Sequence, residues 1–544
     1  MDLQQLQNMA DAEIRQRIPT QIRVCTAAGC LSANSQEVLD RIDQAVEEKQ
    51  LESEVCVQSV GCLRLCCQGP LVDVQPSGSM YQRVTTDQAE SIVDGLQGGE
   101  VKAEPLSRED PFFKLQSSVI LKNSGVVEPE RIESYIAHDG YRALGRALQE
   151  MTPPGVMDEV TKSGLRGRGG AGYPTGVKWA TVAKNPAEKR FVVCNADEGD
   201  PGAFMNRSVL ESEPHKVLEG MAIAGYAVGA NQGYIYIRGE YPLAITRLEK
   251  AIKQASSLGL LGTHIFNSTF DFRIDLRIGA GAFVCGEETA LMQSIMGERG
   301  NPVPRPPYPA QEGLWGYPTL LNNVETFANV PNIINNGADW FADIGTEKSK
   351  GTKVFCLTGK VKNIGLIEVP LGTSLRALVE DIGGGIPDGE VKAVQTGGPS
   401  GGCIPEAHLD VPLDYESLRS LGSIMGSGGL IVVDQSDSMV DVARFYMSFC
   451  MDESCGKCIP CRVGTVHLHG ILSRILQKQA TAIDLERLEQ LCEMVRDTSL
   501  CGLGNTAPNP VLSTLRYFRE EYESLLQQPS NGRPRQSLPL ISAD

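Results

Sequence analysis

Apolar and polar positions alternate along the first hundred residues in a pattern that predicts a small α/β unit. Short apolar runs near Ile22, Val55 and Leu71 have the length of buried strands. Between the first two runs, apolar residues recur at helical spacing over residues 38–46. Because strands that alternate with helices favour a layered fold, we expect an α/β domain over residues 20–98.

Residues 112–345 form the largest predicted unit. The runs at residues 191–194 and 233–237 are rich in β-branched or aromatic side chains, as strands are. Residues 242–256 and 287–296 have the spacing of helices. This alternation predicts a second α/β domain, which a polar linker at residues 98–111 joins to the first.

The chain changes character twice toward its C-terminus. Residues 351–435 contain short apolar strands and one helix near residues 374–381, whereas the pattern from Met439 onward is helical. One of these helices carries an amphipathic face made of Leu485, Leu488, Leu491 and Val495. Four such segments predict a small helical bundle. We expect the polar, proline-containing residues 528–544 to be disordered.

Length and charge narrow the class of protein. A chain of 544 residues suggests roughly three or four domains. A net charge of −17 argues against a general binder of nucleic acid or of anionic membranes. The first seventeen residues lack the apolar core of a signal peptide, and no stretch reaches the roughly 20 apolar residues of a transmembrane helix. We therefore expect a cytoplasmic protein, or one that is peripheral to a membrane through its partners.

Sixteen cysteines in such a chain indicate metal or redox chemistry rather than disulfides. Five that stand alone in apolar runs are expected to be buried thiols, namely Cys194, Cys285, Cys356, Cys450 and Cys492. Near the C-terminus the spacing is C-x2-C-x2-C with a distant fourth cysteine, at Cys455, Cys458, Cys461 and Cys501. This pattern suits four thiolates around a [4Fe–4S] cubane.

A second set consists of two pairs, Cys25 with Cys30 and Cys62 with Cys66. Two pairs suit a [2Fe–2S] rhomb in which each pair holds one iron. Zinc is the alternative, although its cysteine pairs usually stand closer in sequence, most often as C-x2-C. Cys56 and Cys67 are surplus, and the Gly-Cys-Leu-x-x-Cys context favours Cys66 over Cys67.

Residues 164–179 are dense in glycine. They match G-x-G-x-x-G from Gly167 to Gly172, but the preceding residues look helical rather than like the strand of a Rossmann turn. Glycine lets a backbone approach a ligand closely and leaves amides to face phosphate. Since Arg168 and Lys178 add positive charge, the segment predicts a phosphate cradle of non-Rossmann topology. A flexible surface loop is the alternative.

Further polar segments have the composition of a ligand site. Residues 195–202 follow a predicted strand, and ligands sit at strand ends in α/β folds. Glu287 and Glu288 open a predicted helix, whose dipole stabilises negative charge there. The alternatives are a solvated acidic turn and a capped helix start. Residues 304–309 form a proline-bounded arm that can hold an aromatic ring over a flat ligand, and residues 322–325 offer amides.

Taken in order, these motifs resemble the FMN-binding, NADH-oxidising subunit of respiratory complex I and its relatives in soluble NAD-linked hydrogenases and formate dehydrogenases. The similarity covers residues 115–525. The N-terminal region resembles the thioredoxin-like [2Fe–2S] ferredoxin of that subunit's partner, here fused in front. The fusion is most similar to the diaphorase subunit of bidirectional NAD(P)-linked [NiFe] hydrogenases.

The resemblance implies roles for individual residues. The implied FMN site consists of Gly167, Arg168, Gly169, Gly170, Lys178, Asn195, Asp197, Glu198, Gly286, Glu287, Glu288, Asn322 and Asn323. The implied NADH site consists of Tyr173, Asp200, Glu288, Arg305 and Tyr308. In it, the two tyrosines stack on the nucleotide, Glu288 lies near the nicotinamide ribose, and Asp200 accepts from the 2′-OH of the adenosine ribose and repels a 2′-phosphate. Thr181 replaces an aromatic residue of the family, and Asp200 replaces a glutamate.

The resemblance also implies an architecture and cluster ligands. It divides the chain into a thioredoxin-like [2Fe–2S] domain (1–100), a linker (101–114), a Rossmann-like FMN- and NADH-binding domain (115–348), a β-grasp-like domain (349–436), a four-helix bundle with the [4Fe–4S] site (437–527) and the tail (528–544). The [2Fe–2S] ligands are then Cys25, Cys30, Cys62 and Cys66, and the [4Fe–4S] ligands are Cys455, Cys458, Cys461 and Cys501.

The implied activity is that of a diaphorase, which passes electrons between NAD(H), FMN and the clusters. Hydride transfer then takes place on FMN, and no side chain is expected to act as a catalytic acid or base. The implied partners are other diaphorase iron–sulfur subunits and the hydrogenase large and small subunits, with ferredoxin or flavodoxin as further candidates and no nucleic acid. The alternatives are the same module in complex I or in an NAD-dependent formate dehydrogenase, and a zinc-stabilised scaffold without enzymatic activity.

Overall fold

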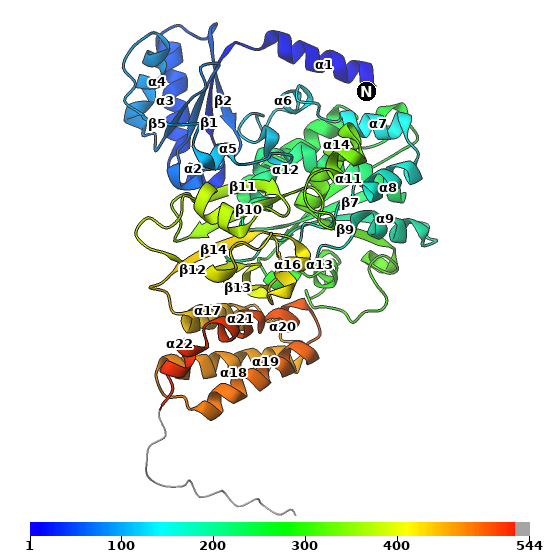
Figure 1. Cartoon of the computed structure of the whole chain (residues 1–544). Helices are drawn as coiled ribbons and strands as arrows, with labels where there is room; N and C mark the ends of the chain where they lie inside the picture. Colours follow the sequence, from blue (N-terminus) through cyan, green and yellow to red (C-terminus); the bar gives the residue numbers. More distant parts are fainter. Residues whose placement is uncertain (528–544) are drawn as a thin grey trace, which may run out of the picture.

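A computed structural model describes residues 1–527, so the predicted disordered tail at 528–544 lies outside the described residues. Three β-sheets and a C-terminal group of helices follow one another along the chain. Figure 1 shows the N-terminal unit beside the second sheet, with the third sheet below them and the C-terminal helices at the far end. Over residues 1–527, no helix combines the length and the apolar character that crossing a membrane requires.

The N-terminal sheet has the strand order β2-β1-β3-β4-β5. Its strands are β1 (Thr20–Cys25), β2 (Val55–Val60), β3 (Val72–Gln75), β4 (Ser79–Gln82) and β5 (Glu104–Leu106). Strands β1 and β2 are parallel, and the other neighbours are antiparallel. Helices α3 (Ser35–Glu48) and α4 (Thr86–Leu96) pack together and share one core with the strands. The α/β layer predicted from the alternation is confirmed.

The stretch expected to be a linker is partly structured. Strand β5 pairs antiparallel with β4, and the short helix α5 (Pro111–Lys114) follows it. Glu104 and Pro105 in β5 are exposed. Because an edge strand of this kind is held by backbone hydrogen bonds and buries little, its polar sequence did not indicate a strand.

The second sheet is fully parallel and has the order β8-β7-β6-β9. Its strands are β6 (Phe191–Ala196), β7 (Gln232–Arg238), β8 (Arg273–Gly279) and β9 (Thr319–Asn323). The helices of this unit are α7 (Arg142–Glu150), α8 (Pro153–Lys162), α9 (Thr175–Lys184), α10 (Met205–Ser212), α11 (Pro214–Val228), α12 (Pro242–Ser257), α13 (Glu288–Ile295) and α14 (Val324–Asn336). The strand and helix positions predicted for this unit are confirmed.

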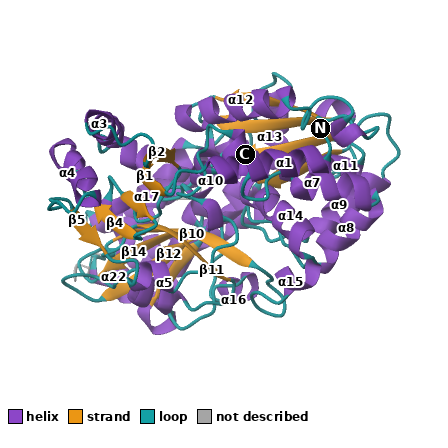
Figure 2. Cartoon of the chain, turned by 90° about the horizontal axis from the view of Figure 1, so that it is seen from above, coloured by secondary structure: helices purple, strands orange, loops and turns teal. Residues whose placement is uncertain are grey.

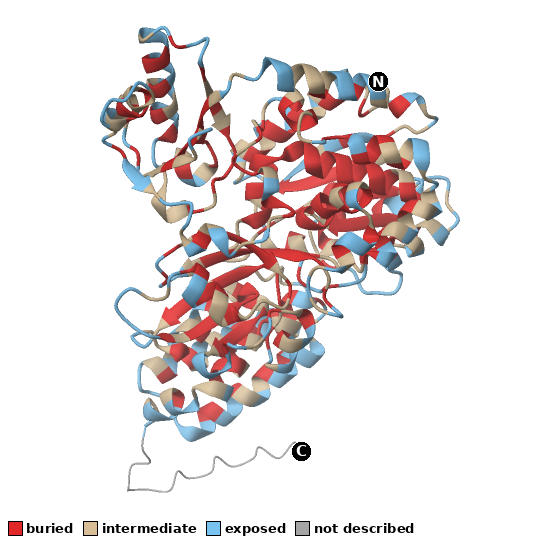
Figure 3. Cartoon of the chain, turned by 45° about the horizontal axis from the view of Figure 1, so that its top comes forward, coloured by how far each residue is buried: buried red, intermediate tan, exposed pale blue. Residues whose placement is uncertain are grey.

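Helices α11 and α14 cover the parallel sheet and are almost wholly buried. Figure 3 shows buried residues, in red, gathered in the sheets and in the helices that pack on them. The other face carries α13, whose Ala290 and Leu291 pack with Val193 of β6. Parallel strands require crossover helices, and both faces must be shielded from water. The N-terminal helix α1 (Leu3–Gln16) lies apart from its own sheet and packs on α6 (Ile132–Ile136) and α7.

The third sheet is mixed, with the order β11-β10-β14-β12-β13. Its strands are β10 (Thr352–Gly359), β11 (Gly365–Pro370), β12 (Val391–Thr396), β13 (Gly402–Pro405) and β14 (Gly429–Asp434). Strands β10 and β14 are parallel, whereas the other pairs are antiparallel. The helix predicted near residues 374–381 is a wide turn of π type at Ala377–Ile382.

The C-terminal helices form the predicted bundle. They are α17 (Met439–Asp452), α18 (Ile459–Leu476), α19 (Ala482–Thr498) and α21 (Asn509–Tyr517), with the shorter α20 (Gly502–Thr506) and α22 (Arg519–Ser524). Leu485, Leu488 and Val495 of the predicted amphipathic face lie in its core. Two short helices elsewhere are α15 (Ala338–Ala342) and α16 (Tyr415–Ser420). Figure 2 shows from above how helices surround the parallel sheet.

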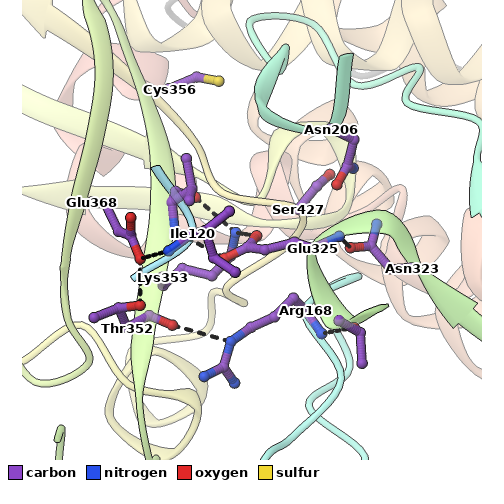
Figure 4. A network of polar contacts seen from close by, with 12 residues as sticks. Ile120, Arg168, Asn206, Asn323, Glu325, Thr352, Lys353, Cys356, Glu368 and Ser427 are labelled. Carbon is purple, nitrogen blue, oxygen red and sulfur yellow. Dashed lines mark hydrogen bonds and ion pairs between the residues drawn. The ribbon is translucent and has the colours of Figure 1, made fainter. Parts of the chain in front are cut away.

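A buried ionic network fastens the third sheet to the parallel-sheet unit (Figure 4). Lys353 of β10 pairs with Glu325 in the first turn of α14, and both side chains are almost wholly buried. Glu325 also accepts from the Val354 amide at 2.9 Å. Glu368 of β11 accepts from the Thr352 hydroxyl and from three successive amides at residues 119–121. Because each buried charge has a partner, the network fixes how the two units meet.

We expect Lys353→Met to destabilise this junction by about 3–5 kcal/mol, because it leaves the Glu325 carboxylate buried without a counter-charge. The double variant Lys353→Met/Glu325→Gln should recover most of the loss, since the amide oxygen can still accept from Val354. Urea midpoints from intrinsic fluorescence would measure both. Equal midpoints for the single and double variants would contradict the assigned role of the ion pair.

Candidate functional site

The end of strand β6 is joined to the loop before α13. Asn195 donates from Nδ2 to the Gly286 carbonyl at 2.8 Å, and its Oδ1 accepts from the Asp197 amide at 3.0 Å. Gly286 ends the short turn η4 (Phe283–Gly286), and α13 begins two residues later. Three residues that the sequence analysis assigned to FMN, on two distant segments, therefore lie together.

Asp197 presents an acceptor that the protein does not use. Its side chain is only 2% exposed, and its Oδ1 lies 3.5 Å from Nη1 of Arg238 on β7. Its Oδ2 is buried and, within residues 1–527, accepts no hydrogen bond. Burial raises the pKa of Asp197 to about 7, against the opposing effect of Arg238. An orphaned buried carboxylate oxygen at a strand end fits a site for a ligand that donates a hydrogen bond.

Glu198 is occupied by the protein itself. Its two oxygens accept from the amides of Asn206 and Arg207, each at 3.0 Å, at the start of α10. Burial raises the pKa of Glu198 to about 7. This side chain therefore caps a helix, which differs from the flavin contact expected from the sequence. A carboxylate is favoured there because the first amides of a helix lack partners within the helix.

The glycine-rich segment makes a close turn in which side chains would not fit. Gly170 and Gly172 have φ of +119° and +64°, values that suit glycine. A Cβ at Gly172 would lie 2.6 Å from the Tyr415 ring, and one at Gly169 would lie 3.2 Å from Cβ of Asn323. The glycines therefore let the segment pack closely against Asn323, just before α14, and against Tyr415 of α16. The phosphate cradle itself stays a prediction.

Arg168 does not direct its charge into this turn. Its side chain is fully buried and donates to the carbonyls of Arg166, Lys350 and Thr352. Figure 4 shows the bond to Thr352, beside the buried ion pair. The expected role in a positive cradle is thus not what the side chain does. It braces the glycine segment against β10, because a guanidinium can satisfy several carbonyls at once.

Lys178 of α9 reaches across to β9 and to the acidic pair Glu287 and Glu288. Its Nζ is 3.1 Å from the Leu321 carbonyl and 3.4 Å from Oε2 of Glu288. The following residue, Trp179, donates to Oδ1 of Asn322 at 3.2 Å. Asn323 caps α14 by accepting from the Glu325 amide. Of the two predicted cations of the glycine-rich segment, Lys178 is therefore the one whose charge lies in the polar site.

The two glutamates before α13 have different roles. Glu287 caps the helix by accepting from the amides of Thr289 and Ala290, both at 2.9 Å. Glu288 instead pairs with Arg305 at 2.5 Å and lies beside Lys178. A capped helix start explains the first carboxylate and leaves the second one for other contacts. Arg305 also reaches Glu287 at 3.2 Å, so the proline-bounded arm closes against the pair.

The other residues that the sequence analysis assigned to NADH lie on three separate segments. Tyr173 and Tyr308 are 53% and 54% exposed. Asp200 faces the third sheet, where Ser427 donates to its Oδ2 at 2.5 Å. The contact is with a second glycine-rich segment, at residues 426–429, which adjoins a third at residues 397–402. The sequence analysis missed both segments and Ser427, although their clustered glycines were a visible signal.

The four C-terminal cysteines line one small cavity with apolar walls. Cys455, Cys458, Cys461 and Cys501 meet there with Val284, Leu500 and Leu503. Cys458 immediately precedes α18, and Cys501 immediately precedes α20. Burial raises the pKa of Cys461 to about 11. Buried thiols of this kind lose their protons when they bind a metal ion. The four cysteines therefore have the chemistry of ligands to an iron–sulfur cluster.

The N-terminal set is also gathered at one place. The Cys25 thiol at the end of β1 lies near the thiols of Cys30 and Cys62, and the Cys62 thiol lies near that of Cys66. These contacts hold the pKa of Cys25 well below its ordinary value. The surplus Cys67 instead accepts from the Ile364 amide at 3.3 Å. Four mutually adjacent thiols on two loops fit the predicted [2Fe–2S] ligand set.

The loops that carry these N-terminal thiols are docked on the rest of the protein. The Ala28 amide donates to Glu211 at 3.0 Å, and the Cys62 amide donates to the Ser212 hydroxyl at 2.9 Å. Both acceptors lie at the end of α10. The Cys67 amide donates to the Ile364 carbonyl of the third unit at 3.1 Å. Helix α10 thus runs from the Glu198 cap to the N-terminal cysteine loops.

The other cysteines agree with the sequence analysis. Cys194, Cys285, Cys356, Cys450 and Cys492 are buried, and all sixteen cysteines are free thiols. Within residues 1–527, the two cysteine sets included, no three His, Cys, Asp or Glu side chains stand as close together as the ligands of one metal ion do.

Comparisons with known families match four regions of the chain. The Nuo51 FMN-binding domain matches residues 160–332, and the iron–sulfur binding region of NADH-ubiquinone oxidoreductase F matches residues 441–525. A thioredoxin-like [2Fe–2S] ferredoxin matches residues 13–97, and an SLBB domain matches residues 354–404. Both predicted cysteine sets fall inside iron–sulfur regions, which favours clusters over zinc.

Individual relatives give the same picture. The NADP-reducing hydrogenase subunit HndC of Solidesulfovibrio fructosivorans is 60% identical over 76% of this chain and 84% of its own length. The NADH-quinone oxidoreductase F subunit of Escherichia coli is 42% identical over 74% of this chain and 91% of its own.

A crystal structure of an NAD+-reducing [NiFe]-hydrogenase contains a similar chain. It is 30% identical, with a TM-score of 0.68, and the match covers 96% of this chain and 88% of the other. The fold of nearly the whole molecule is therefore shared, including the N-terminal unit. The chain belongs to the family of FMN-binding, iron–sulfur flavoprotein subunits that includes the NADH-quinone oxidoreductase F proteins and the hydrogenase subunit HndC.

Proposed function

We propose that the chain is a diaphorase subunit that passes electrons between NAD(H), FMN and iron–sulfur clusters. The observation that carries this proposal is the position of one short segment. Val284 lines the cavity of the C-terminal cysteines, and Glu287 belongs to the polar site beside β6. These two residues are three positions apart, roughly 11 Å even at full extension. A nucleotide site and a cluster site so close together suit electron transfer between them.

The residues proposed to hold FMN divide into contacts and supports. Gly167, Gly169, Gly170, Lys178, Asn195, Asp197, Gly286, Asn322 and Asn323 are proposed to face the cofactor, and Arg168, Glu198 and Glu287 to hold the loops that do so. When bound, FMN supplies the exchange between a two-electron hydride donor and one-electron clusters. The orphaned Asp197 oxygen and the glycine turn support this assignment.

The nucleotide is proposed to lie over the exposed side of this site. Tyr173 and Tyr308 offer aromatic faces from the glycine segment and from the proline-bounded arm. Arg305 must exchange at least one of its two carboxylate partners for an anionic ligand if it is to contact the pyrophosphate of NADH. Glu288 then becomes available to ribose hydroxyls. The arm therefore supplies both a cation and an aromatic ring.

A hydrogenase complex is the proposed setting, with iron–sulfur diaphorase subunits and the hydrogenase large and small subunits as partners. The likeness to a chain of an NAD+-reducing hydrogenase extends over 96% of this chain, N-terminal unit included. Sequence identity points the same way, since it is 60% to the hydrogenase subunit HndC and 42% to the NADH-quinone oxidoreductase F subunit of Escherichia coli. Both observations support the hydrogenase setting over complex I. We also propose a cytoplasmic location. We propose domain boundaries at 115, 349 and 437, with the first domain extended from residue 100 to Leu106 because β5 belongs to its sheet. The four family matches fall inside these boundaries.

Exposed apolar residues lie on the helices that carry the C-terminal cluster site. Ile459, Val463 and Val466 follow one face of α18, Met494 lies near the end of α19, and Leu500 follows α19. Leu500 also lines the cysteine cavity. Because an electron acceptor must approach this cluster closely, we propose that an iron–sulfur partner subunit covers the face.

Purification of the tagged chain from its own host under anaerobic conditions would test the setting. We expect the purified complex to reduce NAD+ with hydrogen and not with formate. Val466→Glu should reduce co-purification of the partner, because it places a charge in the apolar face. Ile483→Glu, at the opposite end of α19, is the matched control and should leave the complex intact. If the purified complex oxidises NADH with a dye but does not reduce NAD+ with hydrogen, the diaphorase function stands and the hydrogenase setting is wrong.

Replacement of a cluster ligand should separate the two halves of the activity. We expect Cys458→Ala to retain oxidation of NADH by a dye that accepts electrons from flavin. Transfer to the physiological partner should fall below detection, because the cluster cavity loses one of its four thiolates. Cys56→Ala, at a cysteine outside both sets, should retain both activities. Comparable loss of both activities in the Cys458 variant would contradict this division.

Asp200→Ala should relax the preference for NADH over NADPH by about tenfold, because it removes the carboxylate that is proposed to repel a 2′-phosphate. The ratio of kcat/KM for the two nucleotides measures the effect. Asp388→Ala, at an exposed aspartate of the third unit, is the control. An unchanged ratio in the Asp200 variant would show that another group selects the nucleotide.

A further inference from the structure

The carboxylate of Asp200 accepts a hydrogen bond from a residue of another structural unit. Asp200 lies in the loop after β6, whereas the hydroxyl that donates to its Oδ2 at 2.5 Å belongs to Ser427, before β14 of the third sheet. Across residues 1–527, Ser427 is the one side chain that donates a hydrogen bond to this carboxylate. Its Oδ1 accepts no hydrogen bond from the described residues.

Glycine lets the third sheet approach Asp200 this closely. A Cβ at Gly398, which has a φ of +56°, would lie 3.1 Å from Cγ of Asp200. A Cβ at Gly426 would lie 2.4 Å from Cα of Gly397. The two glycine-rich segments therefore stack on each other and enclose one side of the carboxylate. This arrangement limits the rotamers that Asp200 can adopt.

The surroundings oppose ionisation of Asp200, and Ser427 favours it. Burial raises the pKa of Asp200, and the hydrogen bond from Ser427 lowers it. The titratable groups near it are Asp197 and Glu198 on the same loop and Tyr446 and Cys450 on α17, none of which is a cation. The serine hydroxyl is thus the group that stabilises the charged form.

We propose that Ser427 is a specificity-determining residue that positions the Asp200 carboxylate to select the nicotinamide nucleotide without a 2′-phosphate. This proposal rests on the proposed function, in which Asp200 faces the adenosine ribose. An ionised, fixed carboxylate accepts a hydrogen bond from a 2′-OH and repels a 2′-phosphate. A protonated or mobile carboxyl group does both less well. Nucleotide choice is then set jointly by the flavin-binding unit and the third sheet.

Ser427→Ala should raise the NADPH-to-NADH ratio of kcat/KM by about tenfold, the effect of losing one hydrogen bond to a charged group. The change should appear mainly in KM, because it concerns binding of the nucleotide. Without the hydroxyl, the pKa of Asp200 is higher, so the carboxylate protonates at a higher pH. Repulsion of the 2′-phosphate is present above that pKa and is lost as the pH falls through it. The ratio should therefore rise more steeply toward acid pH in the variant.

The experiment compares Ser427→Ala with Ser427→Thr, which keeps the hydroxyl, in the intact complex across the neutral pH range. Calorimetric titration with NADP+ gives a second readout that does not depend on turnover. Ser420→Ala, at an exposed serine of α16, is the control for the third unit. FMN content and the melting temperature verify that each variant is folded.

Two failures can be told apart. If the wild-type complex does not oxidise NADH, the proposed function fails. If it does, and the ratio and the affinity for NADP+ are the same in wild type and Ser427→Ala at every pH, the proposal for Ser427 is overturned. The same follows if Ser427→Thr behaves like the alanine variant, because the hydroxyl would then not be the relevant group.

Discussion

The buried contact between Lys353 and Glu325 is the constraint on which the rest of the site depends. It joins a strand of the third sheet to the first turn of α14, and Asn323 and the glycine segment meet at that turn. A buried ion pair contributes little net stability, but breaking it is costly, so it fixes an arrangement more than it strengthens one. Arg168 extends the same arrangement, since its guanidinium bonds the glycine segment to the backbone of β10.

The chemistry proposed for the chain depends on two segments that each contact the polar site and one of the cysteine sets. The segment at residues 283–288 serves both the polar site and the C-terminal cysteine cavity. Helix α10 serves the same polar site at its start and the N-terminal cysteine loops at its end. The strand ends of the parallel sheet are thus linked to both thiol sets, through α10 to the N-terminal set and through residues 283–288 to the C-terminal set. An electron carrier needs this kind of proximity more than it needs an acid or a base.

The sequence predicted the architecture well because the relevant signals are local. Helical and strand periodicities identified the three layered units and the bundle, and cysteine spacing identified both thiol sets. Arg168 and Glu198 were assigned to FMN because the family resemblance implied it. Their side chains turn instead to carbonyls of β10 and amides of α10, which are tertiary partners that no local pattern reveals. Strand β5 was missed for a related reason, since its pairing partner, not its own sequence, makes it a strand.

The docking of the N-terminal cysteine loops bears on how the protein is made. Cys25, Cys30 and Cys62 are between 1% and 4% exposed, and their loops are bonded to α10 and to the third unit. Of the four predicted ligands, Cys66 alone is not fully buried. Docking of the N-terminal unit therefore encloses three of the four thiols and leaves Cys66 as the more accessible one. If these cysteines hold a cluster, its assembly and the closure of the fold around it are linked steps.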